Sequence, residues 1–144
     1  MSTNFRIATL NNKSVAFYPL LGQFLANRKV INALDGYPPY DDDNREWFVA
    51  LDEGNKVVGF SAVADMKSYV LLASNYVLPD YRHNGIFTHI THLEIEKYRH
   101  KQIRVVANQH SSKLYLAIGF IPYKPATKNY HYLYLQGLKK EEAE

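Results

Sequence analysis

The segment from Arg82 to Thr88 has the residue types of an anion-binding turn. Pro79 ends a buried apolar strand, and a helix is expected to begin at about Gly85. A helix N-terminus offers free backbone N–H groups and the positive end of the helix dipole, which suit a phosphate or pyrophosphate. Gly85 allows close backbone approach, Arg82 can add a charged contact, and Thr88 offers a hydroxyl. This pattern predicts a diphosphate-binding loop, although an ordinary strand–helix connection has the same composition.

A second group of chemically useful residues follows further along the chain. Asn108 closes a short strand, the segment 111–118 reads as a short helix carrying Tyr115, and Gly119-Phe120 opens the next strand. A phenol with a pKa of about 10 can serve as a proton donor. The alternative is a packing tyrosine on an amphipathic helix, and the chain has 12 tyrosines.

Hydrophobic periodicity predicts the elements that position these residues. Strands are expected at 5–10, 46–52, 56–65, 68–78, 103–107, 120–123 and 129–135, with a hairpin turn at 53–55. Helices are expected at 85–100 and 111–118, and two short ones between 13 and 34, the second beginning near Pro19. The expected core side of helix 85–100 carries Ile86, Ile90, Leu93 and Tyr98.

The central unit of this order is strand 68–78, helix 85–100 and strand 103–107. Such a unit predicts two parallel strands joined by a right-handed crossover. Strand 68–78 is nearly continuously apolar, which indicates burial on both faces. Strand 103–107 is also expected to be buried.

The two motifs together resemble the GCN5-related N-acetyltransferase (GNAT) family. Val77-x-Pro79-x-Tyr81-Arg82-x-x-Gly85-Ile86 looks like the family's acyl-CoA pyrophosphate loop. Asn108-x-x-Ser111-x-x-Leu114-Tyr115-x-x-x-Gly119-Phe120 is similar to its second motif. The order of elements over residues 4–135 also fits. The resemblance implies an α+β fold, one domain over residues 1–144, with a mixed sheet of about seven strands, four helices and a splayed parallel pair in the middle.

What the resemblance implies about function is acetyl transfer from acetyl-CoA to a primary amine by direct attack in a ternary complex. Tyr115 would be the general acid, and a backbone N–H near Val77 would stabilise the thioester oxyanion. The pantetheine arm would add like a strand beside Tyr76 and Val77. The residues expected to hold the cofactor are Tyr76, Val77, Arg82, His83, Asn84, Gly85, Ile86, Phe87, Thr88, Asn108 and Lys113, with Arg104 as an alternative to Lys113 at the 3′-phosphate.

The sequence departs from the family pattern at two places, one that concerns the general base and one that concerns the cofactor cleft. Strand 68–78 has no carboxylate, so the general base is unassigned; Ser74 or Asn75 could order water, and Asp65 or Glu46 could serve from neighbouring elements. The family commonly has Gly or Ala where Phe87 stands. That side chain either points into the helix–sheet core or fills the cofactor cleft and weakens binding. A non-catalytic acyl-CoA sensor or interaction module of the same fold is therefore the alternative.

An acidic and aromatic loop lies where the family's variable acceptor loop is found. Carboxylates beside aromatic rings can hold a cationic amine by charge and cation–π contact, or can simply be solvated surface. The residues expected to bind the acceptor, a small-molecule or peptide amine, are Tyr37, Tyr40, Asp41, Asp42, Asp43 and Asn75.

Composition bounds the remaining possibilities. The chain has 144 residues, a formal net charge of +3 and no cysteine, which excludes disulfides, thiolate metal sites and a cysteine nucleophile. No apolar stretch is long enough to span a membrane, and residues 1–6 lack the apolar run of a signal peptide, so a cytoplasmic protein is expected. The tail 139–144 is charged and expected to fray.

The other clusters carry weaker signals. His83, His89, His92 and His100 lack a third metal ligand at a persuasive spacing, so no metal is expected. Cations between Arg82 and Lys128 could favour nucleic acid, but no recognition motif supports it and we do not expect that partner. Tyr130, Tyr132 and Tyr134 share one strand face, which either lines the acceptor cleft or forms a homodimer contact.

Overall fold

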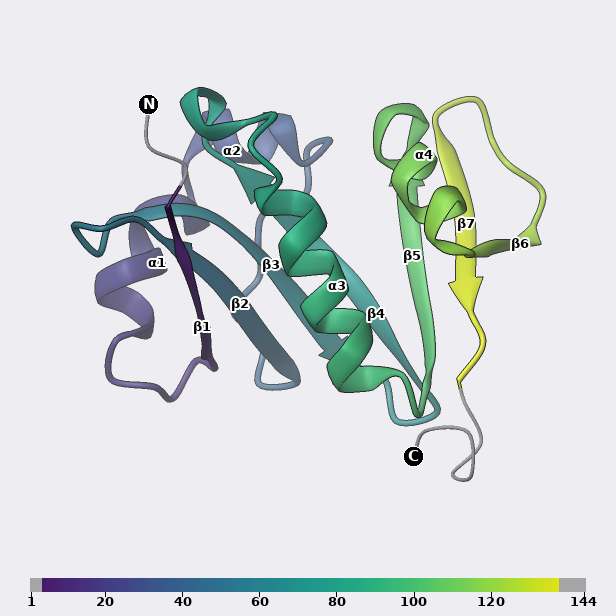
Figure 1. Cartoon of the computed structure of the whole chain (residues 1–144), viewed down its shortest axis with the longest axis horizontal. Coiled ribbons are helices and arrows are strands. Elements are labelled where there is room, and N and C mark those ends of the chain that lie inside the picture. Colours follow the sequence, from purple (N-terminus) through teal and green to yellow (C-terminus); the bar gives the residue numbers. More distant parts are fainter. Residues whose placement is uncertain (1–3, 138–144) are drawn as a thin grey trace.

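The computed structural model describes residues 4–137 and is built on one seven-stranded sheet with the order β1-β2-β3-β4-β5-β7-β6 (Figure 1). The strands are β1 (Arg6–Leu10), β2 (Arg45–Leu51), β3 (Val57–Asp65), β4 (Tyr69–Val77), β5 (Gln102–Asn108), β6 (Ile121–Lys124) and β7 (Tyr130–Leu135). Strands β4 and β5 are parallel, and the other neighbours are antiparallel. The expected mixed sheet with a central parallel pair is confirmed, and the charged tail 139–144 lies outside the described residues.

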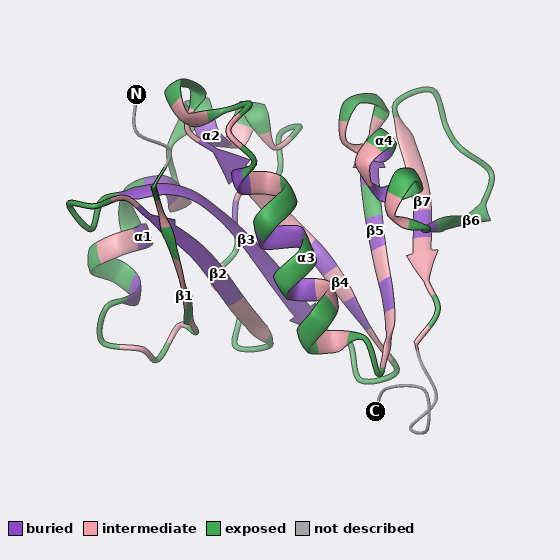
Figure 2. Cartoon of the chain, viewed as in Figure 1, coloured by how far each residue is buried: buried purple, intermediate pink, exposed green. Residues whose placement is uncertain are grey.

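Helices cover both faces of this sheet. They are α1 (Phe17–Leu25), α2 (Arg28–Ala33), α3 (Ile86–Tyr98) and α4 (Gln109–Ile118), with a short 3-10 helix η1 (Pro79–Tyr81) between β4 and α3. Phe17 of α1 packs with Trp47 of β2, whereas Ile90 of α3 packs in a second cluster with Phe48. Because successive strand residues point to opposite faces, β2 and β3 contribute to two cores and are buried along most of their length (Figure 2).

The boundary between the first two helices differs from the expectation. Pro19 lies in the first turn of α1, where its missing N–H removes no helical hydrogen bond. The break comes instead at Asn27, whose side chain accepts hydrogen bonds from the backbone of Lys29 and Val30. Asn27 is therefore the N-cap of α2, and a helix start near Pro19 was the wrong prediction.

The buried side of α3 is partly polar. Ile86 and Ile90 are buried as expected, but Leu93 is 37% exposed. Thr91 and Glu94 are instead fully buried against the sheet. The apolar spacing predicted the helix correctly but placed its face incorrectly, because two polar residues lie where hydrophobic ones were expected.

Burial of β4 on both faces is also corrected. Val70 and Leu72 are buried beneath α3, but Tyr69 and Leu71 on the other face are only partly buried. The α1–α2 cluster includes Tyr76 of β4 and no earlier residue of that strand. Strand β5 is likewise half-buried, with Val106 exposed.

Strands β4 and β5 pair for only part of their length. The pairing runs from Tyr69↔Gln102 to Leu72↔Val105, and then the strands separate, as Figure 1 shows. A bulge follows in β4. Ala62 pairs with Ala73 and Phe60 with Tyr76, so that Ser61 of β3 faces both Ser74 and Asn75. A bulge bends its strand and increases the local twist, which turns the end of β4 away from β5. We call this region the β4–β5 divergence.

Close packing of α3 on the sheet depends on Gly59. A Cβ there would lie 3.1 Å from Cγ2 of Ile86 and 3.2 Å from the carbonyl oxygen of Tyr76. We expect Gly59→Val to lower the free energy of unfolding by about 1–3 kcal/mol because the start of α3 must shift. Gly22→Ala is the matched control: its Cβ meets nothing within 4 Å, and alanine should stabilise α1 by up to ~1 kcal/mol. Urea titration of both variants measures the difference, and equal stability of Gly59→Val and wild type would contradict the close contact.

Candidate active site

The turn that begins α3 presents backbone amides with no partner. Among residues 4–137, the amides from His83 to Thr88 find no hydrogen-bond acceptor, and the helical pattern begins with the bond from His89 N to Gly85 O. Gly85 is the N-cap and has no side chain to satisfy them. Unpaired N–H groups at a helix start form a site for an anion, so the predicted diphosphate-binding loop has the required donors.

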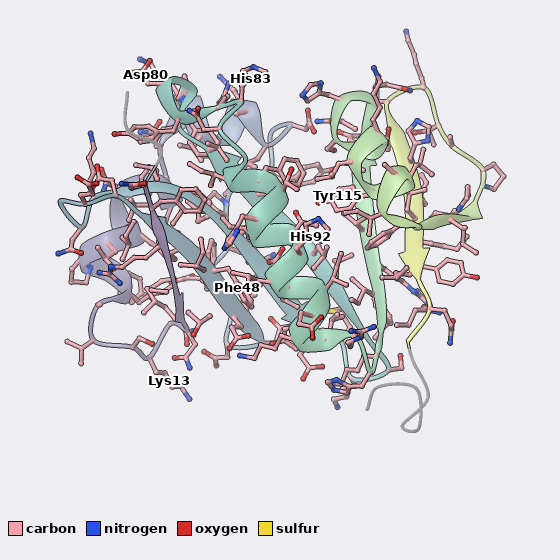
Figure 3. The ribbon with its side chains drawn as sticks, viewed as in Figure 1. Lys13, Phe48, Asp80, His83, His92 and Tyr115 are labelled. Atoms are coloured by element: carbon pink, nitrogen blue, oxygen red, sulfur yellow. The ribbon has the colours of Figure 1, made fainter. Side chains whose placement is uncertain are left out.

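Glycine at position 85 fits this loop for a conformational reason. Its φ is +82°, which other residue types rarely adopt, and a Cβ built there would meet no atom within 4 Å. His83 also has a positive φ of +66°. Figure 3 shows His83 and Asp80 on the turn that leads into α3. The space next to Gly85 is therefore open.

Arg82 is held against β4 rather than against the helix N-terminus. Its Nε donates to the carbonyl oxygen of Val77 at 2.9 Å, and its guanidinium carbon lies 5.6 Å from the centre of the Tyr76 ring. The amide of Leu78 bonds to Val58 O of β3, so the N–H and C=O of Val77 point the other way, into the β4–β5 divergence. Tyr76, Val77 and Arg82 are thus brought together at this unpaired edge.

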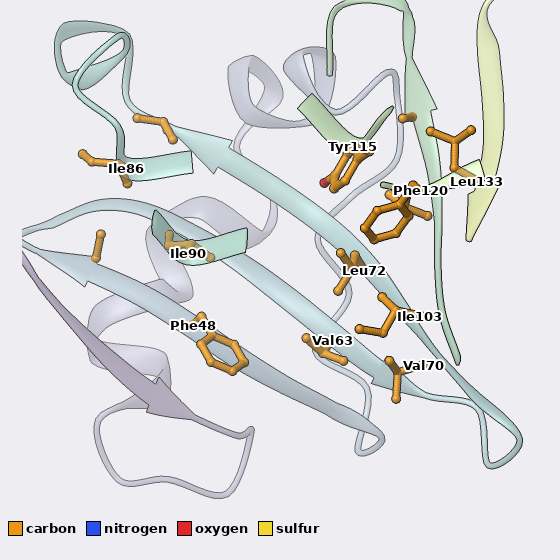
Figure 4. Close-up of a cluster of buried hydrophobic side chains, with 14 of the residues drawn as sticks. Phe48, Val63, Val70, Leu72, Ile86, Ile90, Ile103, Tyr115, Phe120 and Leu133 are labelled. Carbon is orange, nitrogen blue, oxygen red and sulfur yellow. The ribbon is translucent and has the colours of Figure 1, made fainter. Parts of the chain in front are cut away.

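Tyr115 lies in the core between α4 and the sheet. It is 3% exposed, its ring is 5.2 Å from that of Phe120, and Figure 4 shows its hydroxyl directed toward β4. Burial raises the pKa of this phenol well above 10, and the nearby Glu94 carboxylate raises it further, whereas Asn75 and Thr91 lower it. Tyr115 is therefore a protonated donor across the whole physiological pH range.

The second sequence motif explains how Tyr115 is positioned. The side chain of Asn108 caps α4 by accepting from the amide of Ser111 at 2.8 Å. Gly119, with φ of +124°, ends the helix, and the amide of Phe120 bonds to Tyr115 O at 3.0 Å. The polypeptide then turns so that Phe120 packs on Tyr115. The predicted cofactor residue Asn108 thus has a capping role in this structure.

Phe87 points into the helix–sheet core. It packs against the main hydrophobic cluster, and its ring lies 5.9 Å from that of Tyr115. The contact joins α3 to α4 across the β4–β5 divergence. Of the two orientations considered for this bulky side chain, the core-facing one is therefore observed, while the backbone amide of Phe87 remains without an acceptor.

The acidic loop is tied to neighbouring elements. Asn12 donates to Asp43 at 2.6 Å, Tyr18 donates to Asp41, and Asp42 lies 4.0 Å from Nε of Arg45. Tyr37 and Tyr40 are exposed.

Arg45, which sequence reasoning missed, connects this loop to the bulge. Its Nη1 donates to Ser74 Oγ at 3.0 Å, and its guanidinium carbon lies 5.9 Å from the centre of the Tyr40 ring. Burial lowers the pKa of Arg45, and Asp42 opposes that shift. A charged group thus reaches the edge of the β4–β5 divergence from the α1–α2 side.

The carboxylates considered as bases are engaged elsewhere. Glu46 accepts from Lys97 at 2.6 Å and from Tyr98 at 2.7 Å. Asp65 accepts from the amide of Lys67, which together with Lys101 holds its pKa below the usual range. Glu94 is the carboxylate whose charge raises the pKa of Tyr115. Its burial was not revealed by the periodicity of α3.

A polar pocket of about 480 Å³ opens at the end of β5. Its lining residues are Asp35, Asn108, Gln109, His110, Asn129 and Tyr130. Partial burial raises the pKa of Tyr130, and nearby Asp35 and Tyr37 raise it further. Asp35 begins the same acidic run as Asp41–Asp43, which was the available sequence signal; the other lining residues came together only through folding.

The remaining predicted groups do not converge on the loop. Lys113 is exposed on α4. Arg104 lies on the opposite face from α4, with its guanidinium carbon 3.9 Å from the centre of the Tyr69 ring and 5.2 Å from that of Tyr123.

Within residues 4–137 no three histidine or acidic side chains gather as a metal site. None of the helices in that range is long and apolar enough to cross a membrane.

Comparisons with known proteins agree with this geometry. No protein in the curated set matches the sequence. Among solved structures, Escherichia coli ElaA superposes with a TM-score of 0.74 at 14% identity, covering 91% of this chain and 99% of that one. An acyl-CoA N-acyltransferase from Pseudomonas aeruginosa gives 0.71 at 12% identity, covering 94% and 100%. A spermidine N-acetyltransferase from Vibrio cholerae, in complex with CoA and spermine, gives 0.66 at 12% identity, covering 93% and 96%. These likenesses show the fold.

The family itself is shown by the sequence. The model of the acetyltransferase (GNAT) domain matches residues 43–122, which span β2, the loop before α3, Tyr115 and the start of β6. The match includes both motifs and the β4–β5 divergence between them. This chain is a member of the GNAT acetyltransferase family.

Proposed function

We propose that this protein transfers an acetyl group from acetyl-CoA to a primary amine by direct attack in a ternary complex. The observation that carries the proposal is the run of unpaired backbone amides at His83–Thr88, which follows the end of β4 that no longer pairs with β5. The hydroxyl of Tyr115 points toward β4 (Figure 4). Acetyl-CoA, when bound, supplies the thioester. The amides of the loop bind its pyrophosphate, and the N–H of Val77, which β5 does not pair with, orients the pantetheine arm and the carbonyl oxygen.

Tyr115 then acts as the general acid. Its high pKa keeps the hydroxyl protonated until charge develops on the departing sulfur. The rings of Phe87 and Phe120 pack against the Tyr115 ring, which is almost completely buried. The acceptor amine enters from the α1–α2 side, where the pocket at Asp35 and Tyr130 offers a carboxylate to a cationic amine. The spermidine enzyme of similar fold supports a small amine as acceptor.

A non-catalytic acyl-CoA sensor is the second candidate. It is favoured by the composition of β4, which carries no carboxylate from Tyr69 to Val77. Both candidates require cofactor binding, but only the enzyme produces CoA thiol with a supplied amine. Calorimetry with acetyl-CoA, followed by a screen of primary amines for released thiol, separates them.

Tyr115→Phe tests the assigned acid. The ring packing is preserved, so we expect acetyl-CoA affinity and thermal stability to stay near wild type while kcat falls by about 10²-fold, the usual contribution of a positioned acid. Tyr69→Phe, at the end of β4 that pairs with β5, is the control and should keep full activity. Unchanged kcat in Tyr115→Phe would remove the acid role from this residue.

Gly85→Val tests the loop. A β-branched residue at φ of +82° is strained by about 1–3 kcal/mol, so the turn must change shape and its amides must move. We expect acetyl-CoA affinity to fall by about tenfold in calorimetry. Gly36→Val is a closely matched control, because Gly36 has φ of +87° and also meets nothing within 4 Å, yet lies outside the loop. If both variants bound acetyl-CoA equally well, the loop would not be the diphosphate site.

A further inference from the structure

The side of β5, β6 and β7 that faces away from α4 is covered by no helix of the described chain. The hydrophobic cluster beneath α1 and α2 takes its residues from β1–β4 and includes none from these three strands. Cross-strand pairing and ring contacts place five side chains on this side, which we call the β5–β7 face: Arg104, Val106, Tyr123, Tyr132 and Tyr134. Val106 is 45% exposed and Tyr123 38%. An antiparallel sheet often has one side in water, so the charges on this face, rather than its exposure, indicate what it binds.

Arg104 is held on this face with its anion-binding edge free. Its guanidinium contacts the rings of Tyr69 and Tyr123, and its Nε donates to Oε1 of Gln102 at 2.7 Å. Within residues 4–137 neither Nη donates to an acceptor, and no carboxylate lies within 4.0 Å of this side chain. The two Nη groups are the pair that binds a carboxylate in bidentate fashion. Because the guanidinium is oriented in advance, it loses little side-chain freedom when it binds an anion.

Lys124 adds a second positive charge to the same face. Its Nζ lies 4.2 Å from the centre of the Tyr132 ring. The Tyr123 ring is next to both cations, since its centre is 6.3 Å from that of Tyr132 and 5.2 Å from the guanidinium carbon of Arg104. Lys124 also has no carboxylate within 4.0 Å in the described chain. The face therefore carries positive charge that no neighbouring acid balances.

The opposite end of the face is acidic. Tyr130 lies two residues before Tyr132 on the same side of β7, and it lines the polar pocket together with Asp35. Asp35 is exposed, and no cation lies within 4.0 Å of it among residues 4–137. From Tyr130 to Tyr134, opposite Arg104, the strand runs about 14 Å at 3.4 Å per residue. The surface thus offers a negative charge at the pocket and positive charges further along β7.

We propose that the β5–β7 face binds an acidic side chain of an extended peptide whose terminal amine is the acetyl acceptor. The inference rests on the proposed acetyl transfer and names the acceptor class. The cationic amine end enters at the pocket beside Asp35, and a carboxylate further along the peptide binds Arg104 and Lys124. An extended peptide advances about 3.3 Å per residue, so the acidic residue lies about four residues from the amine.

The arrangement of charges favours a peptide over other occupants. The cations already lie over the rings of Tyr69 and Tyr132, which leaves those ring faces unavailable for stacking bases. Asp35 and the acidic run 41–43 would repel the successive phosphates of a nucleic acid. A second copy packed through the same face would bring like charges together. A peptide with an amine at one end and one acidic side chain matches both ends of the surface.

Two peptides that differ only by Glu or Gln at the fourth position test this acceptor class. We expect kcat/KM to be about tenfold higher for the Glu peptide at low ionic strength, because its carboxylate makes charge-assisted hydrogen bonds. Since the site is partly exposed, the preference should shrink in salt of about 0.5 M. Equal kcat/KM for the two peptides at low salt would overturn the inference and leave the proposed function intact.

Variants of the two cations assign the preference to the face. Arg104→Gln should remove it while the Kd for acetyl-CoA and kcat/KM for the Gln peptide stay at wild-type values. Lys124→Gln should reduce it in part, and provides a second variant if Arg104→Gln folds poorly. Lys56→Gln is the matched control, because it makes the same change of charge in the exposed hairpin between β2 and β3 and should keep the full preference. A full preference in both Arg104→Gln and Lys124→Gln would overturn the assignment.

Calorimetry of both peptides in the presence of CoA gives a readout independent of turnover. Tighter binding of the Glu peptide that Arg104→Gln abolishes would support the face, even if the wild type transferred acetyl groups to no amine and the proposed function failed. Two other results would overturn the peptide assignment. One is a single-stranded oligonucleotide whose binding is lost in Arg104→Gln, and the other is a dimer that Val106→Glu dissociates in sedimentation velocity.

Discussion

At the bulge in β4, one residue of β3 faces two residues of β4, and from there the strand turns away from β5. The other parts of the site are arranged around this irregularity. The N–H of Val77 faces the gap because β5 no longer pairs with β4 there, and the carbonyl oxygen of Val77 accepts instead from Arg82 Nε. Ser74 of the bulge has a positive φ of +54°, and its hydroxyl oxygen accepts a hydrogen bond from Nη1 of Arg45. The bulge and the end of the β4–β5 ladder together leave the last residues of β4 without a partner strand on that side.

The sequence allowed much of the fold to be predicted, because the relevant signals are local. The alternation of apolar and polar residues and the turn residues between them located the strands within one or two residues. Asn108 and Gly119 correctly marked the two ends of α4, where they are the N-cap and the C-cap. The boundary near Pro19 failed because proline is tolerated in a first helical turn, so it does not mark a helix start by itself. Burial on both faces of β4 failed because helix coverage is a tertiary property that a single strand does not encode.

The site was predictable where it depends on backbone and less so where it depends on side chains. The loop amides and Tyr115 follow from motifs whose spacing is fixed along the chain. Arg45, Glu94 and Asp35 could not be placed, because each comes to the site from a different element. Glu94 is the clearest case: periodicity favoured Leu93 for the core side, and a rotation of the helix by one position exchanges an apolar residue for an ionisable one.

The two halves of the sheet are joined at one end only. The ladder between β4 and β5 ends at Leu72↔Val105, and the chain crosses from α3 to β5 at the same end, between Tyr98 and Gln102 (Figure 1). At the other end, α3 and α4 meet through side chains, among them the rings of Phe87 and Tyr115, whose centres are 5.9 Å apart. The β4–β5 ladder is therefore the only backbone hinge between the two halves in the described part of the chain, and a separation of their far ends would disturb side-chain packing but no strand pairing.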